Sequence, residues 1–140
     1  MRVITGTAGG INLKAPDGLR TRPTGDKVKQ ALFNIIQYDI AGEVLDLFAG
    51  SGQLGIEALS RDASHAVFVD ADKNAIKIIK ENLAKTKLDS LASVAQTDSI
   101  AFLTMTDRIF DVAFLDPPYG GELLNRAIAE ICRIDILAEG

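Results

Sequence analysis

From residue 43 onward the chain alternates short apolar runs with segments in which apolar residues recur every three or four positions. A short continuous apolar run is typical of a strand buried on both faces, and the longer repeat is typical of a helix with one buried face. These patterns predict strands at 44–47, 66–70, 93–95 and 110–116, and helices at 53–61, 72–86, 99–103 and 121–133. Such alternation predicts an α/β fold, a mostly parallel sheet with helices on both faces.

The first part of the chain has a different pattern, because glycines and prolines interrupt it repeatedly. Residues 2–5 and 11–14 are expected to pair as a small hairpin. Thr24 is then placed to cap a helix at 25–37. We therefore divide the chain into an N-terminal arm, residues 1–24, and one larger domain, residues 25–140.

Composition supports a single globular domain of 140 residues. A hydrophobic fraction of 47% and a charged fraction of 24% exclude a disordered chain. The lone cysteine, Cys132, has no internal disulfide partner, and no apolar run is long enough to cross a bilayer. We expect a cytoplasmic protein that has no membrane partner.

Charge is unevenly distributed along the sequence. The whole chain carries −4, but residues 1–29 carry six basic and two acidic side chains, and the remainder carries nine basic and seventeen acidic ones. A basic arm on an acidic body suits contact with a phosphate backbone through the arm alone. Chance clustering on a solvated surface explains the charge equally well, so charge by itself does not decide the partner.

A glycine-rich turn follows the first predicted strand and opens a helix, which is where open α/β sheets bind ligands. Gly50 and Gly52 allow a ligand to approach the backbone, and Asp70 at the end of the next strand could accept hydrogen bonds from ribose hydroxyls. With Gly55 the turn also fits a dinucleotide fingerprint. Asp46 favours S-adenosylmethionine over a dinucleotide, because its carboxylate would repel a pyrophosphate and attract a cationic ligand.

A second motif, Asp116-Pro117-Pro118-Tyr119, follows the last predicted strand. The Asp116 carboxylate and the Pro117 carbonyl could accept both hydrogens of an exocyclic amine and direct its lone pair at a methyl group. Tyr119 offers a flat face on which a base could stack. One histidine and one cysteine suggest no metal cluster, and none is needed for this chemistry.

With both motifs placed, the chain resembles class I methyltransferases of the Asp/Asn-Pro-Pro-Tyr/Phe type, which have a Rossmann-like fold. It is most similar to the small-subunit ribosomal RNA guanine-N2 methyltransferases of the RsmD type. The matching segments are Arg2-Val3-Ile4 with Gly6, Gly10 and Leu13; Thr21-Arg22-Pro23-Thr24; Asp26-Lys27-Val28; Ala31-Leu32-Phe33-Asn34; Asp46 to Gly52 with Leu54-Gly55; and Glu57-Ala58-Leu59-Ser60-Arg61.

The resemblance implies S-adenosylmethionine as donor, S-adenosylhomocysteine as product, and no metal. It places Asp46 and the glycine turn at the donor's methionine part, Asp70 at its ribose, and Asp98 with Ser99 at its adenine. The Asp116 to Tyr119 motif would hold the target guanine. The implied donor-binding residues are Arg22, Thr24, Asp46, Phe48, Ala49, Gly50, Ser51, Gly52, Asp70, Ala71, Asp98 and Ser99.

The resemblance also implies a substrate, a guanine N2 amine of ribosomal RNA within a partly assembled small subunit. DNA adenine-N6 methylation is an alternative, as are an NAD-type oxidoreductase and a non-catalytic nucleotide-binding fragment. The family's sheet has seven strands in the order 3-2-1-4-5-7-6, and this chain supplies only the first four. We therefore expect a C-terminally incomplete domain whose open edge at 110–116 could support self-association.

Overall fold

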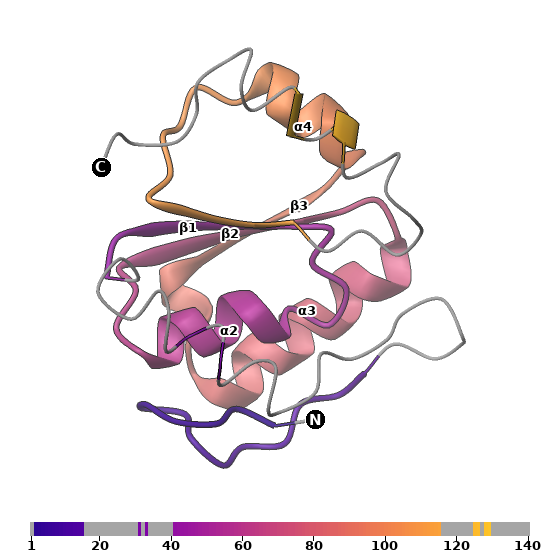
Figure 1. Ribbon diagram of the computed structural model, residues 1–140. Helices are drawn as coiled ribbons and strands as arrows, with labels where there is room; N and C mark the ends of the chain where they lie inside the picture. Colours follow the sequence, from indigo (N-terminus) through magenta and orange to yellow (C-terminus); the bar gives the residue numbers. More distant parts are fainter. Residues whose placement is uncertain are drawn as a thin grey trace.

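A four-stranded parallel sheet with the order β3-β2-β1-β4 forms the centre of the computed structural model (Figure 1). The structure describes residues 2–15, 31, 33, 41–115, 125, 126, 128 and 129. Its elements are β1 (Glu43–Leu47), α2 (Gln53–Ser60), β2 (His65–Asp70), α3 (Lys73–Thr86), a 3-10 turn (Asp89–Leu91), β3 (Ala92–Gln96), α4 (Ser99–Met105) and β4 (Val112–Leu115).

The central strands β1 and β2 are buried on both faces of the sheet, because α2 and α3 cover one face and α4 covers the other (Figure 1). Alternate residues of each strand enter opposite cores. In β1, Val44 contributes to the core under α2 and α3, and Leu45 contributes to the core under α4. In β2, Phe68 contributes to the core under α2 and α3, and Val67 contributes to the core under α4. Two-sided burial explains why these strands are continuous apolar runs without polar alternation.

The predicted α/β class, strand order and parallel pairing are confirmed, and most element ends lie within two residues of the expected positions. One of the largest differences is at the start of the last strand, which was expected at residue 110 and begins at Val112. Asp111 donates its backbone N–H to Glu43 O at 2.8 Å, and its carboxylate accepts from Glu43 N at 2.8 Å. The side chain thus takes a place that a backbone carbonyl would hold in a regular ladder.

Two predicted helices lie mainly outside the described residues. Residues 31 and 33 of the helix expected at 25–37 are helical, as are residues 125, 126, 128 and 129 of the helix expected at 121–133. The proposed domain boundary after residue 24 and the last residue of the expected strand 110–116 also lie outside the described part of the chain.

Residues 2–15 pass beneath α2 and α3, on the side away from the sheet (Figure 1). The expected hairpin pairing is present as one antiparallel bridge between Arg2 and Asn12. It is extended by hydrogen bonds from Val3 N to Ile11 O at 3.0 Å and from Gly10 N to Val3 O at 2.8 Å. Val3 itself is fully buried, so the segment forms part of the core.

Glu57 of α2 attaches this N-terminal segment to the domain. Its side chain is fully buried, and its two oxygens accept from Ile4 N at 2.8 Å and Thr5 N at 3.2 Å. It also forms a 2.8 Å ion pair with Arg61 one helical turn later. A buried carboxylate is tolerated when hydrogen bonds and an opposite charge satisfy it, and Glu57 has both.

The Arg61 guanidinium carries this connection one step further, to the part of the chain that precedes the sheet. It lies over the ring of Phe33, 4.7 Å from the ring centroid. Phe33 is fully buried, and its ring centroid is 5.6 Å from that of Phe114 on β4. One aromatic side chain therefore links the preceding helical residues to both α2 and the last described strand.

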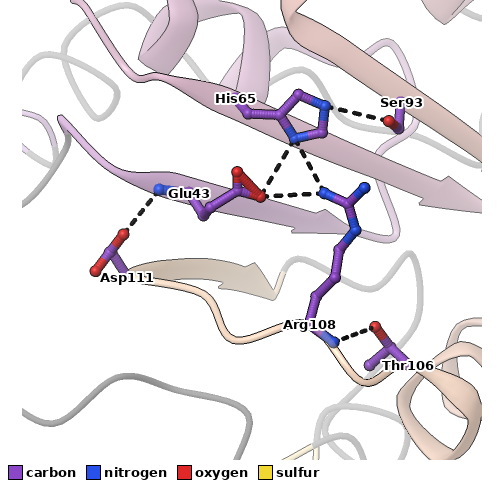
Figure 2. Close-up of polar contacts among 6 residues, drawn as sticks. All are labelled: Glu43, His65, Ser93, Thr106, Arg108 and Asp111. Atoms are coloured by element: carbon purple, nitrogen blue, oxygen red, sulfur yellow. Dashed lines mark hydrogen bonds and ion pairs between the residues drawn. The ribbon is translucent and has the colours of Figure 1, made fainter.

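Four polar side chains meet at the amino ends of the strands (Figure 2). His65 Nδ1 lies 3.3 Å from Glu43 Oε1, and His65 Nε2 lies 3.1 Å from the Ser93 hydroxyl. Arg108 Nη1 is 3.2 Å from the same Glu43 oxygen. This cluster joins β1, β2, β3 and the loop before β4 at the edge of the sheet opposite the glycine turn.

Replacing Glu57 by Gln should lower the free energy of unfolding by roughly 2–4 kcal/mol. The amide has one acceptor oxygen, so it cannot accept from Ile4 N on one side and from Thr5 N and Arg61 on the other, and it removes the counter-charge of a largely buried guanidinium. The matched control is Glu81→Gln, whose ion pair with Lys14 is exposed (61% and 43% for the two side chains) and should be worth about 1 kcal/mol or less. Urea denaturation of both variants tests this, and equal losses would show that Glu57 does not anchor the segment.

Candidate functional site

The turn that follows β1 has a backbone that only a few residue types adopt easily. Phe48, Gly50 and Gly52 all have positive φ angles, of 62°, 62° and 81°. Glycine tolerates this region freely, but an aromatic residue such as Phe48 is strained there. The turn is fixed at two points, since Ala49 N donates to Val69 O at 2.9 Å and Gly52 N donates to Ala49 O at 2.8 Å. Strain held in this way is typical of functional turns.

Asp70, the last residue of β2, joins this turn to the neighbouring strand. Its Oδ2 accepts from Gly50 N at 2.9 Å, and its Oδ1 accepts from Asp72 N at 2.9 Å. The side chain is partly exposed. Each carboxylate oxygen has two lone-pair directions, so both oxygens retain capacity to accept from a ligand hydroxyl.

Asp46 acts as a distant cap for α2. Gly52 stands at the N-cap position of this helix and supplies no side-chain acceptor. Asp46 is 2% exposed, and its Oδ2 accepts from Gly55 N, in the first turn of the helix, at 3.0 Å. The bond satisfies one of the unpaired N–H groups of the helix start and sets a negative charge against the positive end of the helix dipole.

Gly55 is required for close packing. A Cβ atom at this position would lie 2.4 Å from Cε1 of Phe68 on β2. No such contact is tolerated between real atoms, so any larger residue would push α2 away from the sheet. The third glycine of the motif therefore keeps the turn and its helix against β2, where Asp70 is located.

Asn82 was not among the residues predicted from the sequence, although it connects the turn to the N-terminal segment. Asn82 is 1% exposed on the inner face of α3. Its amide nitrogen donates to Ser51 O and to Lys14 O, both at 2.9 Å, and its Oδ1 accepts from Lys14 N at 2.8 Å. The signal available in the sequence was a polar residue on the same helix face as Ile79 and Leu83, because a buried polar side chain needs hydrogen-bond partners.

The predicted adenine-side residues lie at the carboxyl end of β3, beside β2. Thr97 N donates to Asp70 O at 3.1 Å, which brings the loop after β3 to the end of β2. Asp98 is exposed and caps α4, because its Oδ2 accepts from Ala101 N at 2.9 Å. Ser99 is buried, and Ala71 is exposed directly after Asp70. These positions share the sheet edge of the glycine turn.

The remaining predicted site residues lie outside the described part of the chain, namely Arg22, Thr24, Asp116, Pro117, Pro118 and Tyr119. What is described is the strand before the proline motif. Leu115, the last residue of β4, is paired with Leu47, the last residue of β1. β1 and β4 therefore end at the same edge of the sheet, and the glycine turn and the proline motif follow them directly in the sequence.

Among the described residues, no group of three or more histidine, cysteine, aspartate or glutamate side chains is arranged to hold a metal ion. No helix within the same residues is long and apolar enough to span a membrane.

Comparison with known proteins gives consistent matches over almost the whole chain. A family model described as conserved hypothetical protein 95 matches residues 1–140. The chain is 46% identical over 143 residues to YlbH of Bacillus subtilis (strain 168), covering 99% of this chain and 78% of YlbH. It is 42% identical over 136 residues to Ribosomal RNA small subunit methyltransferase D of Haemophilus influenzae, covering 94% and 70%. The solved structure of yhhF from Escherichia coli gives a TM-score of 0.89 at 34% identity, covering 99% and 75%.

Asn82→Ala should lower the free energy of unfolding by about 1–3 kcal/mol and loosen the glycine turn. The substitution leaves Ser51 O and both backbone groups of Lys14 without their buried partner. Asn74→Ala is the control, since Asn74 is exposed on the same helix. Urea denaturation and amide hydrogen exchange at residues 50–52 test the pair of variants. Unchanged exchange in Asn82→Ala would contradict a role of this side chain in holding the turn.

Proposed function

The chain belongs to the family described as conserved hypothetical protein 95, and from this we propose that it transfers a methyl group from S-adenosylmethionine to the N2 amine of a guanine in small-subunit ribosomal RNA. Its fold is that of Rossmann-like class I methyltransferases. The observation that carries the proposal is the hydrogen bond from Gly50 N to Asp70, because it unites a strained glycine turn and a ribose-type acceptor at one sheet edge. Small-subunit ribosomal RNA is the substrate for which the Haemophilus influenzae relative is named, and the guanine N2 amine is what the resemblance to RsmD-type enzymes implies.

The residues at this edge fit the chemical groups of the donor. Asp70 has accepting capacity for two ribose hydroxyls, and Gly50 and Gly52 leave the backbone of the turn without side chains. Asp46 adds negative charge behind the turn, which suits the ammonium and sulfonium of the donor. Asp98 and Ser99 would border the adenine, Phe48, Ala49, Ser51 and Ala71 would line the donor, and Arg22 and Thr24 would lie near its carboxylate.

The bound donor would supply an electrophilic methyl group on a positively charged sulfur. The protein's own task is to make a base amine attack, although the amine lone pair is delocalised into the ring. Acceptors at Asp116 and Pro117 would bind the two N–H bonds and favour the pyramidal nitrogen of the transition state. Tyr119 would stack on the base and hold it in line with the methyl group.

The structure weakens the case for a dinucleotide. A pyrophosphate bound in the dinucleotide manner uses the free N–H groups at the start of the helix after the first strand. In this protein Gly55 N, in that first turn, already donates a hydrogen bond to the Asp46 carboxylate at 3.0 Å, and Asp46 places a negative charge beside the helix start. A DNA adenine-N6 methyltransferase remains the second candidate, because the Asp-Pro-Pro-Tyr motif suits any exocyclic amine.

Isothermal titration should show that S-adenosylmethionine or S-adenosylhomocysteine binds the chain and that NAD does not compete. Asp70→Ala should weaken donor binding by about 1–3 kcal/mol, since it removes acceptors for the ribose and frees Gly50 N and Asp72 N. Asp70→Asn, which keeps one acceptor oxygen, should lose less. Asp107→Ala, an exposed carboxylate in the loop before β4, serves as the control. Saturable NAD binding without donor binding would replace the proposal by a dinucleotide-dependent enzyme.

A further inference from the structure

Basic side chains are concentrated on α3. Residues 73–87 contain five lysines and one glutamate, a local charge of +4 in a chain whose net charge is −4. All five lysines are exposed. At 3.6 residues per turn, Lys73, Lys77 and Lys80 lie within an arc of about 60° on the helix, and Lys87 continues the line to a total length of about 20 Å. We name Lys73, Lys77, Lys80 and Lys87 the lysine face.

Helix stability does not explain this arrangement. Lys73 and Lys77 are four residues apart and Lys77 and Lys80 are three apart, so like charges face each other along the helix. Lys73 is also the first residue of α3, where the helix dipole disfavours a cation. Within the described residues, none of the four lysines forms a salt bridge. A ligand with its own regularly spaced negative charges would offset this repulsion.

The N-terminal segment extends the lysine face. Asn82 holds the backbone of Lys14 against α3, and the Lys14 ammonium lies 3.4 Å from the carboxylate of Glu81. Glu81 stands four residues after Lys77 and would be its partner within the helix, but in this structure Glu81 pairs with Lys14. Lys77 therefore has no intrahelical partner among the described residues. A basic residue of the arm and the basic side of α3 therefore form one continuous surface.

We propose that the lysine face binds the phosphodiester backbone of the RNA substrate. The inference rests on the proposed function and adds the surface by which the substrate is held. Lys73 lies three residues after Asp70, at the carboxyl edge of the sheet, and the lysines lead from there toward the amino edge. An RNA strand that presents its target base at the carboxyl edge would thus continue along α3, where charge attracts it without reading its sequence.

The experiment measures binding of transcribed small-subunit ribosomal RNA by fluorescence anisotropy at about 50 to 200 mM salt. Lys77→Gln/Lys80→Gln removes two charges and leaves Lys73 beside the donor site intact. The slope of log K against log salt should become shallower by about 1.4 to 1.8, with affinity reduced at least about tenfold near 0.1 M salt. The control, Arg108→Gln/Met105→Glu, changes the net charge equally at the C-terminal end of α4 and the loop that follows, across the sheet.

The outcomes separate this proposal from the proposed function. The lysine face is supported if only the α3 variant changes the salt slope while its titration with S-adenosylhomocysteine matches the parent. Equal changes in both variants, or no change in either, would overturn it and leave donor binding and methyl transfer by the parent as evidence for the function. Unchanged binding of RNA with reduced methylation of partly assembled subunits would assign the lysine face to ribosomal protein instead, which also overturns it. A parent chain that binds neither donor nor RNA would overturn both.

Discussion

The candidate site depends on one carboxylate at the end of the second strand. Asp70 accepts from Gly50 N and from Asp72 N, so it fixes the turn after β1 and the start of α3 at the same time. The turn has three positive φ angles, including that of Phe48, and such a backbone persists only where its surroundings hold it. Without Asp70 the carboxyl edge of the sheet would keep its strands but lose the shape of the glycine turn.

The segment before the sheet is built into this arrangement. Glu57 holds residues 4 and 5 from a fully buried position, and Asn82 joins Lys14 to the same turn that Asp70 fixes. Arg61 and Phe33 extend the connection to β4, which ends beside the turn. The strand that leads to the proline motif and the turn that follows β1 are therefore linked through packed side chains as well as through backbone pairing.

The fold could be predicted closely from the sequence because its signals are local. Apolar runs such as 44–47 and the three-to-four repeat of α3 depend only on neighbouring residues. The start of β4 lies two residues later than expected because the side chain of Asp111 pairs with Glu43, a contact that no repeat along the chain encodes.

The glycine turn and Asp70 could be placed at one edge of the sheet from the sequence, but their contacts could not. The glycine turn and Asp70 stand out by spacing, and they meet as expected. The bonds of Asp46 to Gly55 and of Asn82 to Ser51 and Lys14 depend on the packing of α2 and α3. Only a buried polar residue in an apolar helix face pointed to Asn82, and that pattern does not name a partner. The lysine face of α3 was likewise visible in the sequence, but only the structure shows that Lys14 lies next to α3.

Mass spectrometry of nucleosides from small-subunit ribosomal RNA tests the central claim most directly. RNA from a strain that lacks the gene should contain less N2-methylguanosine than RNA from its parent. The intact gene should restore the modification and a copy that carries Asp116→Ala should not, although both proteins bind the donor equally. Unchanged N2-methylguanosine in the deletion strain, or loss of N6-methyladenine from its DNA instead, would contradict the account.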